Sequence, residues 1–199
     1  FEMSFSLGLT GSIGMGKSTT AAIFAEMGCA VWDADAAVHR LYAPMGAAVA
    51  PMQRLFPDAI IDGGVNRDRL KSIISQRPAA LKQIEEIVHP LLAEDRAEFR
   101  RSAKADILVF DIPLLFETGG HKAMDAVACV FVDDETQRRR VMERGTMTTE
   151  QFEQILSKQL PIKEKCARSD FVIETDTLEH ARAQVAQILT EINGRHSDA

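Results

Sequence analysis

A stretch of eight residues near the N-terminal end of the chain has the composition and spacing of a phosphate-binding loop. Gly11-Ser12-Ile13-Gly14-Met15-Gly16-Lys17-Ser18 fits the pattern G-x-x-x-x-G-K-[ST] between a predicted strand and a predicted helix. Glycines let backbone N–H groups turn towards phosphate oxygens, and a helix that begins near Lys17 points the positive end of its dipole to the same place. A simple strand-to-helix turn would also use glycines, but it would not require Lys17-Ser18 after them. The stretch therefore predicts a site for the phosphates of a nucleotide.

The end of this loop also predicts how a triphosphate and a metal ion would be held. Lys17 can bridge the β- and γ-phosphates, and the Ser18 hydroxyl can ligate Mg²⁺. The pattern alone indicates nucleotide binding and not a reaction, because switches and motors share it. The nucleotide contacts predicted here are Gly11, Ser12, Ile13, Gly14, Met15, Gly16, Lys17, Ser18 and Thr19.

Two aspartates end apolar stretches that are predicted to be parallel strands. Val31-Trp32-Asp33 ends one strand, and Leu108-Val109-Phe110-Asp111 ends another. Ligands of such sheets bind outside the carboxyl ends of the strands, so both carboxylates are expected to face the phosphate loop. Phosphoryl transfer to an alcohol needs a ligand for Mg²⁺ and a group that accepts the hydroxyl proton. We predict that Asp111 acts on Mg²⁺, directly or through water, and that Asp33 is the general base.

Helix capping is the alternative role for Asp33 and for its neighbour Asp35. An aspartate before a helix accepts hydrogen bonds from the first N–H groups of that helix. For either residue alone, capping and catalysis are equally good explanations. We interpret Asp35 as the cap and Asp33, which lies nearer the strand, as the catalytic residue.

Two arginines after the fourth predicted strand are candidates for contacts to phosphate. Arg140 and Arg144 are four residues apart, so they would project from one face of a helix. Arginine forks match phosphate oxygens and stabilise the charge of a transferring phosphoryl group. The alternative is a solvated basic face, which we prefer for Arg138 and Arg139. On a lid, Arg140 and Arg144 would close over ATP and exclude water.

The elements that must position these residues follow from short apolar runs that alternate with amphipathic segments. This pattern predicts an α/β fold of the P-loop NTPase type, with a five-stranded parallel sheet between layers of helices. Residues 34–105 are too many for a plain crossover, so a helical subdomain is expected there. Residues 138–168 are a candidate lid. The core then comprises residues 5–33, 106–137 and 170–194 of one domain spanning 1–199. The predicted strands are Phe5 to Leu9, Ala30 to Asp33, Ile107 to Asp111, Ala126 to Val132 and Phe171 to Glu174.

The helices predicted between these strands have their own start and stop signals. Lys17 to Met27 should end at Gly28, and Thr177 to Ile192 should end before Gly194. Pro90 should kink or divide a long helical pattern from Pro78 to Lys104.

Composition excludes several classes of function for this chain of 199 residues. A net charge of −6 argues against sequence-independent nucleic-acid binding, which needs clustered positive charge. Three distant cysteines and five scattered histidines fit neither disulfides nor a structural metal, so we expect reduced thiols. No apolar run is long enough to cross a bilayer, and we expect a cytoplasmic protein. We interpret Met3 as the natural first residue. A monomer or a weak homo-oligomer is expected.

Taken together, these residues resemble the dephospho-CoA kinase family over nearly the whole chain, from Leu7 to Ile192. The segment that runs from Asp111 to Glu117 discriminates best, because other P-loop proteins have no reason to carry it. The stretches that carry the resemblance are Gly8-Leu9-Thr10-Gly11, Val31-Trp32-Asp33-Ala34-Asp35, His89-Pro90, Asp111-Ile112-Pro113-Leu114-Leu115-Phe116-Glu117, Gln137 with Arg140 and Arg144, Gln159, Lys165 and Ser169-Asp170-Phe171-Val172-Ile173.

The resemblance implies a kinase that uses ATP and Mg²⁺ to phosphorylate the ribose 3′-hydroxyl of dephospho-CoA, the last step of coenzyme A synthesis. It also implies a helical CoA subdomain and a lid, with Asp33 activating the hydroxyl and with Lys17 and Arg140 in catalysis at the ATP phosphates. The chain departs from the family pattern at Ser12, Ser75, Ser169 and Thr175. The acceptor contacts that the resemblance implies are Asp33, His89, Leu114, Phe116 and Glu117.

Two of these predicted acceptor contacts, His89 and Phe116, also have a structural explanation. His89-Pro90 is more often a helix-kinking pair, and Phe116 can be a core residue.

Two other functions share the same loop. Another small-molecule kinase, for a nucleoside or a nucleotide, would have the same phosphate loop, Mg²⁺ carboxylate and lid arginines. A switch that binds without transferring phosphate is a different class, and GTP switches carry an Asn-Lys-x-Asp element that this sequence lacks.

Overall fold

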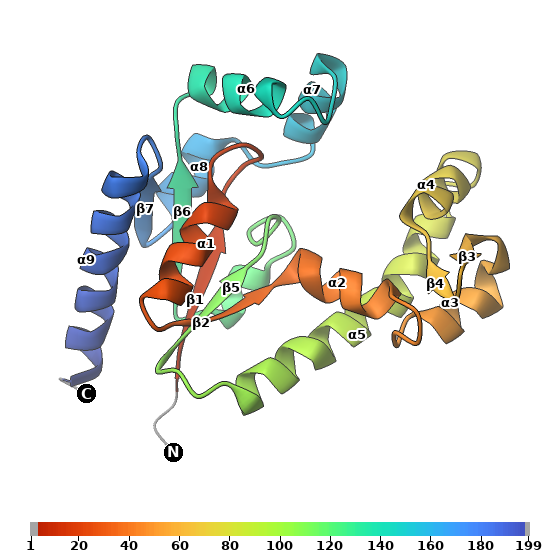
Figure 1. Ribbon diagram of the computed structural model, residues 1–199, viewed down its shortest axis with the longest axis horizontal. Helices are drawn as coiled ribbons and strands as arrows, with labels where there is room; N and C mark the ends of the chain where they lie inside the picture. Colours follow the sequence, from red (N-terminus) through yellow and green to blue (C-terminus); the bar gives the residue numbers. More distant parts are fainter. Residues whose placement is uncertain (1–3, 198–199) are drawn as a thin grey trace. The chain divides into compact units, whose positions relative to one another are not determined.

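The fold was analysed in a computed structural model that describes residues 4–197, with side chains up to residue 194 (Figure 1). Met3, interpreted above as the natural first residue, lies outside this range. The chain divides into two compact units, and each is described by itself. Unit 1 consists of residues 1–32 and 104–199, and unit 2 consists of residues 33–103. No helix among the described residues is both long and apolar enough to span a membrane.

A five-stranded parallel sheet is the frame of the fold, as the apolar runs predicted. β1 is flanked by β5 and β6, so the strand that leads into the phosphate loop is central. Within the sheet Leu9 lies opposite Asp111, which places that carboxylate next to the start of the loop. In spatial order the strands are β2 (Ala30–Asp33), β5 (Ile107–Asp111), β1 (Phe5–Thr10), β6 (Ala126–Phe131) and β7 (Phe171–Glu174).

Helices α1 (Lys17–Glu26) and α9 (Leu178–Ser197) lie side by side in Figure 1, where α1 packs on β1 and β5 and α9 packs on β7. Their apolar residues share one buried cluster with the strands, which includes Leu9, Phe24 and Val185. The prediction that α9 stops before Gly194 was wrong, because the helix continues to Ser197. A solvent-exposed glycine costs a helix only about 1 kcal/mol, so it does not by itself end one.

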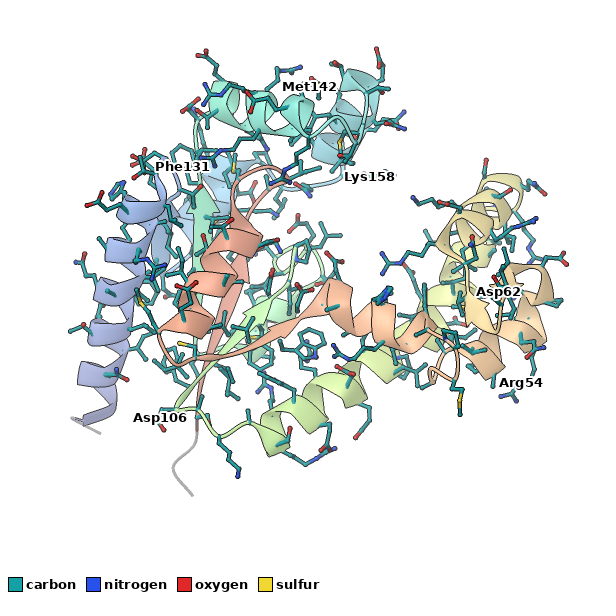
Figure 2. All side chains as sticks on the ribbon, viewed as in Figure 1. Arg54, Asp62, Asp106, Phe131, Met142 and Lys158 are labelled. Atoms are coloured by element: carbon teal, nitrogen blue, oxygen red, sulfur yellow. The ribbon has the colours of Figure 1, made fainter. Side chains whose placement is uncertain are left out.

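Three short helices follow β6 in unit 1. They are α6 (Asp134–Glu143), α7 (Thr149–Ser157) and α8 (Ile162–Arg168). Figure 2 labels Met142 on α6 and Lys158 directly after α7. The side chain of Asp133 caps α6, and a capping box formed by Thr148 and Gln151 begins α7. A short 3₁₀ helix (Gly120–Ala123) lies between β5 and β6.

Unit 2 is helical and has an apolar cluster of its own, which includes Met52, Phe56 and Leu70. Asp62 and Gly63 form the turn of a two-stranded hairpin, where Figure 2 labels Asp62. Its elements are α2 (Ala34–Tyr42), α3 (Val49–Leu55), a 3₁₀ turn (Pro57–Ala59), β3 (Ile60–Ile61), β4 (Gly64–Val65), α4 (Arg67–Gln76) and α5 (Ala80–Ser102).

Pro90 lies inside α5 and does not divide it, so that part of the prediction was wrong. The proline removes one N–H donor, but the buried residues Ile84 and Val88 still fasten the helix to the core of unit 2.

Candidate active site

The predicted phosphate loop connects β1 to α1, as the sequence pattern required. Gly14 and Gly16 have φ values of 75° and 80°, in the left-handed region that favours glycine, and Gly16 is the N-cap of α1. A Cβ atom at Gly14 would lie 2.5 Å from Val141 Cγ2, so packing also excludes a side chain there. Ser12, the departure from the family pattern, is buried and does not have a positive φ, so the loop tolerates it.

Lys17 and Asp111 meet at the mouth of this loop. The Lys17 ammonium donates a hydrogen bond to Asp111 Oδ1, and the two form an ion pair. The Asp111 side chain is only 2% exposed and that of Lys17 is 16% exposed, so water screens the pair weakly. The structure thus brings together the predicted phosphate-binding lysine and the predicted Mg²⁺ carboxylate, whereas Ser18 is exposed on the first turn of α1.

Both predicted lid arginines line a cavity of about 230 Å³ beside the start of α1. Arg140 projects from α6 and donates hydrogen bonds to the carbonyl oxygen of Thr175 at 2.6 Å and to its hydroxyl at 3.3 Å. Arg144 is the C-cap of the same helix, and Gly16 and Thr19 contribute to the same wall. The cavity therefore joins the end of the phosphate loop to two guanidinium groups.

The segment after β5 holds three of the predicted acceptor contacts. Leu114 is exposed, whereas Phe116 is buried in a small cluster with Leu115, which supports the core interpretation of Phe116. Glu117 Oε2 accepts a hydrogen bond from the backbone N–H of Leu160 at 3.1 Å and forms an ion pair with Lys165 Nζ at 3.0 Å. Glu117 Oε1 is buried and has no hydrogen-bond partner within the described residues.

Asp33 is the last residue of β2, and it is the N-cap of α2. Its Oδ1 accepts a hydrogen bond from the N–H of Ala36 at 2.9 Å. The interpretation of Asp35 as the cap was therefore wrong, because Asp35 already lies in the first turn of the helix. A cap residue has an extended backbone before the first turn, and Asp33 has it, with φ −107° and ψ 120°. His89 is exposed on α5 of unit 2.

Comparison with known proteins decides the family. The sequence profile described as dephospho-CoA kinase matches residues 5–180, which is most of the chain. The chain belongs to the dephospho-CoA kinase family. A dephospho-CoA kinase of Ruegeria pomeroyi is 70% identical over 96% of both chains, and one from Jannaschia is 54% identical over 96% of this chain and 98% of its own.

Solved structures agree with the fold of the described residues. A crystal structure of a Thermus thermophilus protein is 30% identical, with a TM-score of 0.85 over 94% of this chain and 97% of its own. The dephospho-CoA kinase from Campylobacter jejuni has a TM-score of 0.65 at 22% identity over 96% of this chain and 98% of its own, which supports the fold alone. Family and fold together make the chain a kinase, for which ATP is the implied phosphoryl donor.

Gln137, Lys165 and Thr175 have no predicted role in the sequence, and Thr175 departs from the family pattern. All three side chains are buried and contact the phosphate loop. The burial of Lys165 and Gln137 indicates a role at the loop, but this burial cannot be read from the sequence alone.

Proposed function

We propose that this chain transfers the γ-phosphoryl group of ATP to the ribose 3′-hydroxyl of dephospho-CoA, giving coenzyme A and ADP. Membership of the dephospho-CoA kinase family supports the acceptor, and the pairing of Lys17 with Asp111 at the mouth of the phosphate loop is the observation that carries the chemistry. This reaction would be the last step of coenzyme A synthesis.

ATP would bind with its phosphates in the loop of residues 11–18. The Lys17 ammonium, held at the loop by Asp111, would exchange this carboxylate for β- and γ-phosphate oxygens. The cavity beside α1 would take the rest of the nucleotide, with Thr19 at its wall and with Arg140 and Arg144 facing the phosphates. Arginines in that place stabilise charge that develops on the phosphoryl group during transfer.

The residues at this site suit Mg²⁺. Ser18 offers a hydroxyl oxygen and Asp111 a carboxylate oxygen, which are the hard donors that Mg²⁺ prefers. When bound, Mg²⁺ would neutralise part of the charge on the β- and γ-phosphates. We propose that Ser18 and Asp111 hold it, with Asp111 acting directly or through water.

Asp33 would accept the proton from the 3′-hydroxyl. The hydrogen bond from the N–H of Ala36 occupies one of its two carboxylate oxygens and fixes the orientation of the group. Capping and catalysis are therefore compatible roles of one side chain. An oriented base within reach of the hydroxyl contributes about 10² to 10⁴ in rate.

The other proposed acceptor contacts are His89, Leu114, Phe116 and Glu117. Support is best for Glu117, because its buried Oε1 could accept a hydrogen bond that no group in the described part of the chain provides. Leu114 is exposed and could contact an apolar part of the acceptor. Phe116 would need its buried cluster to rearrange.

We also propose that separate segments of the chain form the substrate subdomain, the lid and the core, as expected from the sequence. Residues 34–105 would form the CoA subdomain, residues 138–168 the lid, and the remaining segments the core. The protein would work in the cytoplasm as a monomer or a weak homo-oligomer, with dephospho-CoA as its small-molecule partner. The net charge of −6 argues against a nucleic-acid partner.

A coupled assay of ADP release tests the acceptor. The purified chain with ATP and Mg²⁺ is offered dephospho-CoA, nucleosides and nucleoside monophosphates in parallel. We expect turnover with dephospho-CoA and only background release with the other acceptors. Turnover with a nucleoside monophosphate and none with dephospho-CoA would overturn the proposal.

A further inference from the structure

Three carbonyl oxygens of the phosphate loop are each held by a side chain from a different element of unit 1. The carbonyls belong to alternate residues of the loop, and the donors come from α8, from α6 and from the residue after β7. The hydrogen bonds run from Lys165 Nζ to Gly11 O at 3.3 Å, from Gln137 Nε2 to Ile13 O at 2.7 Å and from Thr175 Oγ1 to Met15 O at 2.7 Å.

The three donors are removed from water. Lys165 is 0% exposed, Gln137 4% and Thr175 7%, although such polar residues are mostly exposed in proteins. A buried donor that lost its acceptor would keep the full penalty of desolvation, so these contacts have energetic consequences. Burial of three polar side chains around one short loop indicates that these side chains serve to fix the conformation of the loop.

The buried Lys165 ammonium group contacts both the phosphate loop and the segment after β5. Lys165 Nζ donates hydrogen bonds to Gly11 O at 3.3 Å and to Pro113 O at 3.2 Å, and it forms an ion pair with Glu117 Oε2 at 3.0 Å. One buried side chain thus connects the phosphate loop to the segment after β5, which follows Asp111 and carries Glu117.

The contacts decide which way the peptide groups of the loop face. A carbonyl oxygen carries partial negative charge and would repel a phosphate, whereas an N–H group attracts it. We propose that Gln137, Lys165 and Thr175 are positioning residues that hold these carbonyls away from the phosphates and so present the N–H groups of the loop in advance. The loop then loses little conformational freedom when an anion binds, and affinity rises.

The same contacts connect the loop to the segment proposed as the lid. Gln137 lies immediately before residues 138–168, and Lys165 lies near the end of this segment. Thr175 also accepts the hydrogen bond from Arg140, which links the loop to that arginine. Both ends of the segment are therefore fastened to the peptide groups that would bind phosphate.

The inference rests on the proposed binding of ATP phosphates, and binding of inorganic tripolyphosphate tests it without base, ribose or acceptor. Thr175→Val removes the hydroxyl and keeps the shape of the side chain, whereas Thr175→Ser restores the hydroxyl. Gln137→Met removes an independent donor from another element. The matched control is Thr190→Val on α9, which deletes a hydroxyl bonded to a backbone carbonyl, Ala186 O at 3.0 Å, away from the loop.

Calorimetry should show a Kd for tripolyphosphate that is about tenfold higher in Thr175→Val and in Gln137→Met, the size of one lost hydrogen bond. Thr175→Ser and Thr190→Val should stay within about twofold of the unchanged chain, because both keep the contacts to the loop. In kinetics with ATP, the first two variants should raise KM for ATP more than KM for dephospho-CoA. A purely structural defect would lower the midpoint of thermal unfolding and leave the Kd of the folded protein unchanged.

An unchanged Kd in folded Thr175→Val and Gln137→Met would overturn the inference, and Gln137→Met decides alone if Thr175→Val does not fold. Failure of the proposed function has a different signature. A chain that binds tripolyphosphate with the expected ranking of variants, yet phosphorylates no dephospho-CoA, would overturn the proposed acceptor and support the positioning role.

Discussion

At the residue scale, the Lys17–Asp111 ion pair shows how this site holds charge before a nucleotide binds. The Asp111 carboxylate is almost completely buried, and a buried charge needs a partner. Lys17 is that partner, and it remains partly exposed at the mouth of the loop. The pair keeps the ammonium group in place, and phosphate oxygens can replace the carboxylate as its partner.

Cysteine reactivity gives a prediction about pH at the same scale. Burial raises the pKa of the Cys29 thiol to about 11 from 9.0. A raised pKa lowers the thiolate fraction, so at pH 8 it should be roughly a hundredfold smaller than in the unfolded chain. We expect alkylation of Cys29 by iodoacetamide, followed by mass spectrometry, to be slower by this factor in the folded protein.

The same alkylation experiment carries its own control. The rate should rise about tenfold for each pH unit up to about pH 11, while the rate in denaturant should level off about two units lower. A rate in the folded protein that levels off by pH 9 would show that burial does not suppress this thiol.

At the element scale, sequence patterns predicted the helices and strands, which depend on residues close together in the chain. They did not predict side-chain contacts between residues that are far apart in the chain. The five strands, the loop and the helices after β6 follow from local periodicity and glycine spacing. Capping was misassigned between Asp33 and Asp35, because a pattern cannot locate the first helical residue to within two positions. The contact of Thr175 with Met15 joins residues 160 positions apart, and the sequence holds no local signal for it.

The cap of α2 gives a prediction that separates two roles of Asp33. Asn caps helices about as well as Asp, so Asp33→Asn should change the free energy of unfolding little, while kcat falls by about 10² or more because the base is lost. Asp33→Ala should lower kcat similarly and also cost about 1 kcal/mol of stability. Urea unfolding and steady-state kinetics of both variants measure the two effects.

The two Asp33 variants can contradict the account in separate ways. An unchanged kcat in Asp33→Asn would remove Asp33 from the catalytic role and leave it as a cap. Equal stability of Asp33→Asn and Asp33→Ala would instead show that the hydrogen bond to Ala36 contributes nothing measurable.

At the scale of the whole molecule, the two units have separate apolar clusters and are proposed to have separate tasks. Phe56 is 2% exposed in the cluster of unit 2, and Phe24 is 0% exposed in the cluster beneath α1. Phe56→Leu should lower the free energy of unfolding by about 1–2 kcal/mol and raise KM for dephospho-CoA. Binding of ATP should stay within about twofold, because unit 1 keeps its packing.

Phe24→Leu is the matched control for Phe56→Leu, since it makes the same change in the other cluster. It should weaken ATP binding, because α1 carries the end of the phosphate loop. Calorimetric titration of both variants with ATP and Mg²⁺, together with KM for the acceptor, measures the difference. The opposite pattern would contradict the proposal that unit 2 contributes to acceptor binding.

Phosphorus NMR of the product tests the central claim most directly. The chain is incubated with ATP, Mg²⁺ and dephospho-CoA, and Lys17→Ala serves as the inactive reference. The account predicts a new phosphomonoester signal from the ribose 3′-position, equal in amount to the ADP formed, and no such signal with Lys17→Ala. ADP and inorganic phosphate without the ester, or a phosphate on another hydroxyl, would contradict it.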